Sequence, residues 1–392
     1  MLEVDRAQVL AYRIAAHGLH RDEPDLAALA VFDLGVQSTQ RETAAIALAA
    51  RVAGGITEES FVDDPRFVLA WTHRGAPHFH RREDLPAVTR ALVPLDETDA
   101  TNRMLFQRKM VEAAGISATE GLFTAARAMR EVVDKPMTKG AVSTAVTKII
   151  PAGLSYWCRG CQATHILEQV MRLAAIHGGI RLAAGISPAT LAPIEGRPPM
   201  RTKPDPAAAT AVVADYLRLH GPATPADAAG FVGTTTGLAK RMWPDGLTEV
   251  RLKGVRGLAP SRGLGVAPPE DAGRKAFLPE PAVPLLEAPP EPGIVRLLPP
   301  WDPFLQCRDR GVLVPDRDLQ KQVWKIIGNP GALLVHGEIA GTWRAKASGR
   351  KRLDVTIGPF WSISPAARKE AEAEAERVAA VRGFPGLRLT WS

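Results

Sequence analysis

A unit of helix, helix, turn, helix and strand recurs along the chain, and this repeat most constrains its fold. In the clearest copy a helix is expected over residues 207–220, followed by Thr224-Pro-Ala-Asp227. A threonine cap, a proline in the first turn and an acid three residues after the cap are typical of a helix N-terminus. Gly233 predicts a turn, residues 238–243 the next helix and residues 247–252 a strand. This order predicts a winged-helix unit.

Two earlier segments follow a similar order. In the first, apolar residues recur at helical spacing over residues 4–14, and an alanine-rich helix is expected to end at Arg51. Residues 67–72 and 79–82 then predict two strands, joined by Arg74-Gly-Ala-Pro77. Because Gly and Pro favour turns, this hairpin is predicted to be a wing.

In the second segment, helices are expected over residues 120–133 and 139–150, and a third helix is expected to begin near His165. The pair Gly178-Gly179 predicts a turn, and a strand should follow it. Supersecondary units that recur in this way indicate a repeat architecture.

We therefore predict an α+β protein in which tandem winged-helix (helix-turn-helix) domains precede a C-terminal β-rich region. Alternating apolar residues, a basic turn and a charged helix indicate that the last region is itself α+β. The predicted boundaries are winged helix 1 at 1–98, winged helix 2 at 99–200, winged helix 3 at 201–256, a Pro/Gly-rich connector at 257–302 and the C-terminal region at 303–392.

The charge balance favours a polyanionic partner. Lys and Arg number 49 against 42 for Asp and Glu, which gives a formal net charge of +7. Cations placed on phosphates release condensed counterions, so double-stranded DNA is the expected partner. The three cysteines, the absence of a continuous apolar run and the charged N-terminal segment predict a cytoplasmic protein without a membrane span. A monomer is expected.

Four short motifs carry a family resemblance: Leu34-Gly-Val-Gln37, Trp71-Thr-His-Arg-Gly-Ala-Pro-His78, Leu298-Pro-Pro-Trp-Asp-Pro303 and His336-Gly-Glu-Ile-Ala-Gly-Thr-Trp343. With these motifs in this order, the chain resembles the AlkZ- and YcaQ-like family of winged-helix DNA glycosylases over nearly its whole length. The resemblance implies a monofunctional glycosylase that excises alkylated, N7-substituted purines in base-excision repair without a cofactor. The alternative is a non-catalytic winged-helix DNA-binding protein, such as a regulator or lesion binder.

The resemblance also implies a catalytic motif, Gln-x-Gln or Gln-x-Asp, of which this chain keeps only the first position. Gln37 matches that position, Thr39 stands in the second, and Gln40 lies one residue further along. On a helix one residue rotates a side chain by about 100°, so Gln40 does not simply replace the second position. The catalytic candidates are Gln37, which can orient a water through its amide, with Thr39 or Gln40 assisting. Alternatively, Gln37 caps the following helix or binds phosphate.

Candidate DNA contacts lie in three basic clusters. Wings contact phosphates or the minor groove, where cationic side chains are favoured, and a solvated surface is the simpler alternative. The histidines of the first cluster lack nearby acids or cysteines that would complete a metal site. The candidates are Arg74, His78, His80 and Arg81 on the first wing, Lys240 and Arg241 on a helix, and Arg350 and Lys351 on the C-terminal hairpin. Trp71 and Asp302 are predicted to support the site.

Cys158-Arg-Gly-Cys161 and His165 form the one other constellation with chemical potential. Two cysteines two residues apart, followed by a histidine, have zinc-like spacing, but the pattern places no fourth ligand. A redox pair and a reduced structural pair are the other interpretations. We predict no bound metal, with these three residues as the alternative zinc site.

Overall fold

The computed structural model describes residues 1–253 and 273–392. The fold is mixed α+β, which confirms the predicted class at this level. Four sheets form among the described residues, and helices pack around them. None of the helices in this part of the chain combines the length and apolarity needed to cross a membrane.

The first segment has the predicted helices and strands, starting with a helix whose N-terminus is closed by a capping box at Asp5. An additional short strand precedes that helix. The elements are β1 (Leu2–Val4), α1 (Arg6–Ala16), β2 (Val36–Gln37), α2 (Thr43–Ala49), α3 (Glu58–Val62), β3 (Phe67–Trp71), β4 (Pro77–Arg81) and α4 (Leu85–Ala91).

The second segment follows the order of three helices, a strand, a helix, a hairpin, a helix and two strands. Its elements are α5 (Glu97–Arg103), α6 (Arg108–Ala113), α7 (Ala118–Val132), β5 (Met137–Thr138), α8 (Lys139–Thr147), β6 (Ser155–Cys158), β7 (Ala163–Ile166), α9 (Glu168–His177), β8 (Ile180–Leu182) and β9 (Thr190–Pro193). The predicted start of the third helix, near His165, is wrong, because His165 lies in β7 and the helix begins at Glu168.

Strands β3 and β4 form the hairpin that was predicted as the first wing. This hairpin is not a separate element, because it belongs to a six-stranded sheet of order β2-β4-β3-β8-β9-β5, in which Leu69 pairs with Leu182. Strands of both the first and second predicted domains therefore share one sheet. The predicted boundary at residue 98 therefore does not separate two independent sheets.

The third segment matches its prediction closely. It contains α10 (Pro206–His220), α11 (Pro225–Val232), α12 (Thr236–Arg241) and β10 (Leu247–Leu252). Thr224 and Asp227 form the expected capping box, and Thr235 caps α12. Strand β10 pairs antiparallel with β11 (Arg274–Pro279) and parallel with β1. The N-terminal strand therefore completes the sheet of the third helical unit.

The predicted connector is largely regular structure where it is described. Besides β11 it contains α13 (Val283–Glu287) and β12 (Val295–Leu298), so residues 274–302 hold more regular structure than their Pro/Gly-rich composition predicts. Residues 257–272 of that prediction lie outside the described residues. Apolar residues such as Leu286 and Leu297 are buried and pull this segment into the core.

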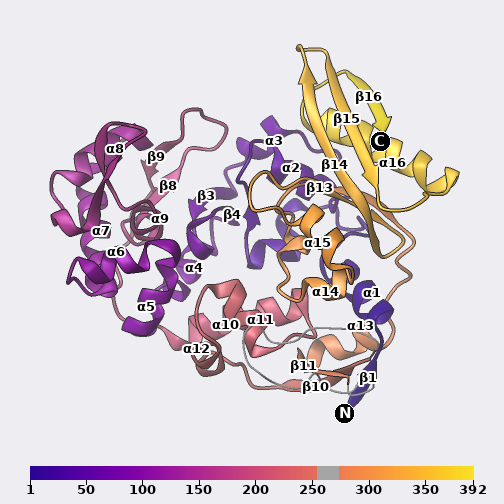
Figure 1. Ribbon diagram of the computed structural model, residues 1–392, viewed down its shortest axis with the longest axis horizontal. Coiled ribbons are helices and arrows are strands. Elements are labelled where there is room, and N and C mark those ends of the chain that lie inside the picture. The colour runs from indigo at the N-terminus through magenta and orange to yellow at the C-terminus, as the bar shows by residue number, and fades with distance from the viewer. Residues whose placement is uncertain (254–272) are drawn as a thin grey trace.

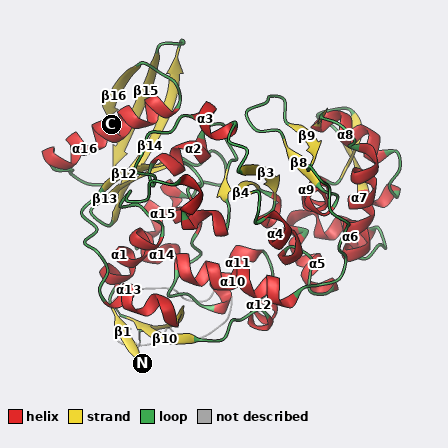
Figure 2. Cartoon of the chain, turned by 180° about the vertical axis from the view of Figure 1, so that it is seen from behind, coloured by secondary structure: helices red, strands yellow, loops and turns green. Residues whose placement is uncertain are grey.

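The C-terminal region has the predicted strands, basic hairpin and charged helix. Its elements are α14 (Arg310–Leu313), α15 (Arg317–Val323), β13 (Gly331–Val335), β14 (Glu338–Ser348), β15 (Arg352–Pro359), α16 (Pro365–Val381) and β16 (Gly386–Trp391). Strand order in the sheet is β12-β13-β14-β15-β16, and Figures 1 and 2 show α16 lying across this sheet.

One hydrophobic cluster joins the first and last regions of the chain. Ala45 and Leu48 of α2 belong to the same core as Ile357 of β15 and Ala375 of α16. In Figure 1 the helices α5–α8 form one arm, the C-terminal sheet forms the other, and α10 to α13 run along the side that joins them. Segments far apart in sequence thus meet in the middle of the molecule.

Candidate functional site

Gln37 lies at this meeting point, at the end of a short strand. It pairs with His78 of β4 and is only 7% exposed. The expectation that Gln37 begins or caps the next helix is wrong, because α2 starts at Thr43 and its cap position is Glu42. The segment between Gln37 and α2 is irregular and rises to the surface at Thr39 and Gln40, which are exposed.

A series of hydrogen bonds holds both ends of the Gln37 amide. Its Nε2 donates to Thr39 Oγ1 at 2.6 Å, and its Oε1 accepts from Gln306 Nε2 at 2.7 Å. Gln306 also donates to the Trp301 carbonyl, and its Oε1 accepts from Arg74 at 3.1 Å. A carbonyl oxygen has two lone pairs, so Gln37 Oε1 keeps one acceptor position for a water. The amide is therefore fixed in orientation before any substrate arrives.

Three arginines without carboxylate partners gather beside Gln306. Arg74, Arg308 and Arg310 line a cavity of about 90 Å³, and none of them forms an ion pair with a carboxylate of the described residues. Burial, followed by repulsion from Arg308, lowers the pKa of Arg74 to about 9. Burial also lowers the pKa of Arg308 and of Arg310, the latter with added repulsion from Arg308. Positive charge concentrated in this way favours binding of an anion such as phosphate.

A second basic cavity of about 240 Å³ lies next to the first, and the two share Asn329 and Pro330. Its lining residues are Gln40, Arg41, Glu42, Thr43, Ile46, Pro300, Asn329, Pro330, Gly331, Trp343, Arg344, Ala345 and Arg382. The sequence-predicted Gln40 thus faces this cavity, whereas Gln37 reaches the first cavity through Gln306. No lysine lines either cavity in the described part of the chain.

Besides Gln306, Arg308 and Arg310, two more residues of this region, Glu42 and Asn329, were not among the sequence candidates. Glu42 is the one carboxylate that lines either cavity among the described residues, and its backbone is left-handed with φ of 64°. A non-glycine residue in this conformation costs about 1–3 kcal/mol and is frequent at functional sites. Asn329 is 6% exposed, and its Oδ1 has no hydrogen-bond partner in the described structure. Only the positive φ of Glu42 and the position of Asn329 between the two cavities, both invisible in sequence, distinguish them.

Asp302 lines neither basic cavity, and it caps the turn that carries Gln306. Its carboxylate forms a two-pronged ion pair with Arg51, at 2.6 and 2.9 Å, and both side chains are fully buried. It also accepts from the Phe304 amide and so begins the turn that carries Gln306. Trp71 is likewise buried, with the Arg172 guanidinium over its ring. Both predicted supporting residues are therefore inside the protein.

Three of the predicted DNA contacts on the first hairpin, His78, His80 and Arg81, require correction, whereas Arg74 lines the first basic cavity. His78 and His80 are 3% and 0% exposed, and both bond to Thr72 Oγ1 at 3.0 Å. Burial lowers the pKa of His80 to about 4, and that of His78 well below its usual range. Arg81 is held by Asp33 and Asp84, and Arg74 donates to Gln306 and to the Phe231 carbonyl. Neutral buried imidazoles and a paired arginine do not form a phosphate-binding wing.

The other predicted contacts are exposed. Lys240 and Arg241 lie on the surface of α12, although Arg241 pairs with Asp96. Arg350 and Lys351 lie at the tip of the β14–β15 hairpin, which projects from the molecule in Figure 1. These positions leave the hairpin tip free to reach a duplex.

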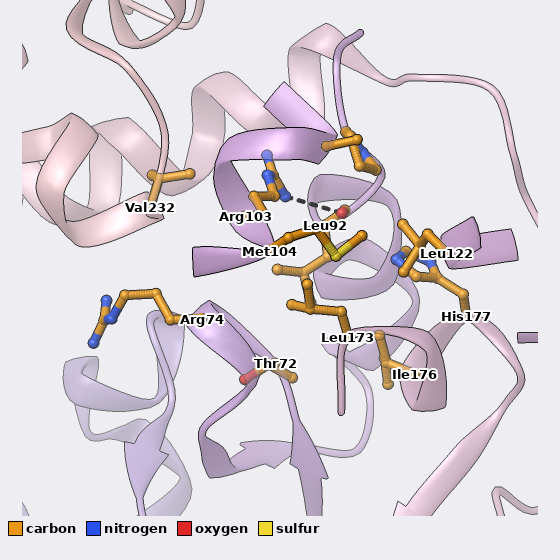
Figure 3. Close-up of a pocket in the computed structure, with 12 residues that line it drawn as sticks. Thr72, Arg74, Leu92, Arg103, Met104, Leu122, Leu173, Ile176, His177 and Val232 are labelled. Carbon is orange, nitrogen blue, oxygen red and sulfur yellow. Dashed lines mark hydrogen bonds between the residues drawn. The ribbon is translucent and has the colours of Figure 1, made fainter. Parts of the chain in front are cut away.

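A third cavity is too small to hold a base. It has a volume of about 20 Å³, and Figure 3 shows Thr72, Met104, Leu173 and His177 among the side chains around it. Such a volume holds about one or two waters. This cavity is a packing space between the sheet and α5, α7 and α9.

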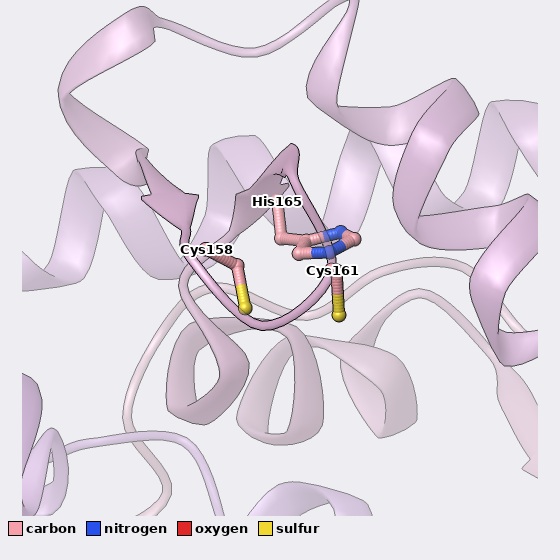
Figure 4. Close-up of side chains that lie close together, drawn as sticks. All are labelled: Cys158, Cys161 and His165. Carbon is pink, nitrogen blue, oxygen red and sulfur yellow. The ribbon is translucent and has the colours of Figure 1, made fainter.

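Cys158, Cys161 and His165 come together on the β6–β7 hairpin, as Figure 4 shows. Hydrogen bonds from the Cys161 amide, the Cys161 thiol and the Gly160 amide lower the pKa of Cys158. Cys307 is buried in another core and does not join them.

Comparison with known proteins gives three results. A family model described as DNA glycosylase AlkZ-like matches residues 33–381. The solved structure of the DNA glycosylase AlkZ from Streptomyces sahachiroi is similar, with a TM-score of 0.74 and 19% sequence identity, over 100% of both chains. The comparison with curated proteins found no match. Because the family model covers most of the chain, including Gln37, Arg74 and Gln306, this protein belongs to the AlkZ-like DNA glycosylase family.

Proposed function

We propose that this protein is a monofunctional DNA glycosylase that removes N7-alkylated purines from double-stranded DNA. The observation that carries the proposal is the fixed amide of Gln37. Gln306 and Thr39 hold it beside two adjacent basic cavities. Family membership supports the reaction class, and the cavities support a polyanionic substrate.

The proposed DNA-binding surface consists of positively charged side chains around the two cavities. Arg74, Arg308 and Arg310 in one cavity, and Arg41, Arg344 and Arg382 around the other, provide guanidinium groups for phosphates. The β14–β15 hairpin with Arg350 and Lys351 extends this surface. Binding of this kind depends on salt and little on base sequence. The helix–strand order of residues 118–193, 206–252 and 274–279 supports tandem winged helices as the framework.

The chemistry required is modest, because alkylation at N7 makes the base a cationic leaving group. The N-glycosidic bond breaks, its electron pair goes to the purine, and the base leaves neutral. Water then adds to C1′ of the oxocarbenium-like sugar and gives up one proton to solvent, which leaves an abasic site. We propose that Gln37 Oε1 orients that water, since it retains a free lone pair.

Thr39 has no charge with which to stabilise the cationic sugar. We propose that Thr39 instead fixes the Gln37 amide and that Glu42 supplies the negative charge. Among the described residues no lysine lines either cavity, so none of these residues offers an amine there for a covalent imine with the sugar. The site residues therefore favour hydrolysis over strand cleavage by the enzyme itself.

The decisive experiment uses a duplex with a single N7-methylguanine. The protein is incubated with it, abasic sites are cleaved with alkali, and the strands are separated by size. We expect scission that depends on alkali treatment and is lost in Gln37→Ala, while Gln322→Ala, an exposed residue on the surface, behaves as the unchanged protein. Scission without alkali would contradict the monofunctional mechanism.

The non-catalytic alternative rests on Thr39 in the second motif position. It predicts tight, salt-sensitive duplex binding with no excision of N7-methylguanine or of a bulkier N7 adduct. A regulator would in addition prefer one sequence by roughly 10³-fold or more over random duplex. Absence of excision from both lesions, with binding retained, would overturn the proposed glycosylase.

A further inference from the structure

The β6–β7 hairpin brings three potential metal ligands together at its tip. A ligand atom from each of Cys158, Cys161 and His165 lies within 4.8 Å of the other two. A tetrahedral zinc with Zn–S of about 2.3 Å places two ligand sulfurs about 3.8 Å apart. The three groups are thus already near the separation that one ion requires, and Figure 4 shows both sulfur atoms on one side of the hairpin.

Strand pairing explains why these residues meet. Tyr156 pairs with His165, and Cys158 pairs with Ala163. Because side chains alternate along a strand, Tyr156, Cys158 and His165 lie on the same face of the hairpin, with Cys158 diagonal to His165. The turn between the strands returns Cys161 to this face, helped by the left-handed backbone of Gln162, with φ of 51°.

The surroundings of the ligand atoms suit a metal. The ligand atoms of Cys158, Cys161 and His165 all lie within 4.8 Å of one another, and thiolates and an imidazole are ligands that zinc prefers. His165 Nδ1 lies 3.3 Å from Ser143 Oγ, whereas its Nε2 is buried without a partner in the described structure. A histidine held through one ring nitrogen presents the other as a lone-pair donor, which is the usual arrangement of metal-binding imidazoles.

We propose that Cys158, Cys161 and His165 bind one zinc ion, with a water as the fourth ligand. Binding replaces the thiol protons of the two cysteines, which are released to the buffer. Cys161 is exposed, so the fourth position is open to solvent. None of the three residues lines the basic cavities beside Gln37, and the proposal does not depend on the glycosylase reaction.

The role of such an ion is structural. Strands β6 and β7 form a two-stranded sheet that joins no other sheet of the described chain. Ile166 is buried at the base of the hairpin, but Trp157 near the tip is 57% exposed. Two-stranded hairpins are marginally stable on their own, so the tip lacks an apolar core to hold it. A bound zinc crosslinks Cys158, Cys161 and His165 and so holds the tip in place of an apolar core.

The test measures metal directly. Protein purified under reducing conditions is analysed for zinc, and the metal-free protein is titrated with Co²⁺, whose thiolate charge-transfer and visible bands report tetrahedral sulfur ligation. We expect about one zinc per chain and these cobalt bands. Cys158→Ser, Cys161→Ser and His165→Asn should each lose the bands. Cys307→Ser, which changes the buried cysteine of another core, should keep them.

Two outcomes would overturn the proposal. One is a reduced protein that contains no zinc and shows no cobalt bands, with the Cys158 and Cys161 thiols freely alkylated. The other is zinc binding that survives in the Cys158→Ser and His165→Asn variants. Circular dichroism identifies any variant that fails to fold, and the cobalt titration of the unchanged protein decides the matter without variants.

Discussion

The Gln306 side chain donates a hydrogen bond of 2.7 Å to the Gln37 carbonyl oxygen across 269 positions of sequence. Arg74 holds the other end of the Gln306 amide. The orientation of Gln37 therefore depends on a residue contributed by the last third of the chain.

Replacing Gln306 should slow excision more than it weakens binding. Gln306→Glu keeps the volume of the side chain and an acceptor for Arg74. A carboxylate, however, cannot donate a hydrogen bond to Gln37 Oε1. Misplacement of a positioning group costs up to about 100-fold, so we expect a single-turnover rate about 10- to 100-fold lower. Gln322→Ala is the exposed control. Equal rates for Gln306→Glu and the unchanged protein would show that the contact does not orient Gln37.

Neutralising Glu42 should lower the rate of base excision. Glu42→Gln removes the one carboxylate that lines the basic cavities among the described residues. We expect the excision rate to fall about 100-fold, and duplex binding to stay equal or tighten because a negative charge is removed. Glu372→Gln, on the exposed face of α16, is the matched control. A binding loss that accounts for the whole effect would rule out a role in stabilising the sugar cation.

The hairpin tip should contribute to affinity through phosphate contacts. The double substitution Arg350→Ala and Lys351→Ala removes two exposed cations. The slope of log affinity against log salt should then decrease by about 1.8, without a change in sequence preference. Fluorescence anisotropy at several salt concentrations measures it. Lys369→Ala, on α16, should leave the slope unchanged, and an unchanged slope in the double variant would place the tip away from DNA.

The Arg51–Asp302 pair should be critical for stability. Both side chains are fully buried, and Arg51 also donates to the carbonyls of His17 and Ala47. Asp302→Asn leaves the guanidinium charge uncompensated, which typically costs about 3–5 kcal/mol. Urea unfolding followed by tryptophan fluorescence measures the change. A loss below about 1 kcal/mol would mean that water or a neighbouring group replaces the carboxylate.

Acid should destabilise the protein through its buried histidines. Burial lowers the pKa of His177 and of His80 to about 4, below the ordinary value of about 6.5. Between these values the unfolded chain binds protons that the folded chain excludes. Their stabilising contribution is therefore complete above about pH 7 and is lost as the pH falls towards 4. Urea midpoints at pH 7.5, 6 and 5 should decline.

His177→Gln should flatten that decline, because it removes one titrating group. His336→Asn, at an exposed position, should not change it. If both variants follow the slope of the unchanged protein, other groups cause the acid sensitivity.

Elements fixed by local chemistry were predictable from sequence. The capping box of Thr224 and Asp227 and the cap at Thr235 lie within a few residues of the backbone groups they satisfy, so α11 and α12 were predicted closely. The failures came from pairing between distant segments. Nothing within residues 67–82 reveals that Leu69 pairs with Leu182, and that pairing turns an expected wing into the middle of a sheet.

The candidate site was predictable only in part for the same reason. The family motif located Gln37, and local spacing located Thr39 and Gln40. Gln306 and Asn329 lie in the last third of the chain, and only tertiary packing brings Gln306 to Gln37. His78 and His80 were predicted to contact DNA, because the sequence alone does not show that these histidines are buried.

The dependence of Gln37 on Gln306 has a consequence during protein synthesis. A nascent chain already holds the Gln37 motif, Arg74 and the helices of the third unit when it has reached residue 253, but it lacks Gln306, Arg308, Arg310 and the strands that complete the core around α2. Fragments released early by the ribosome, or cut later by proteases, would hold the motif without its support. In such incomplete chains the Gln37 amide therefore lacks the Gln306 donor that fixes its orientation in the full chain.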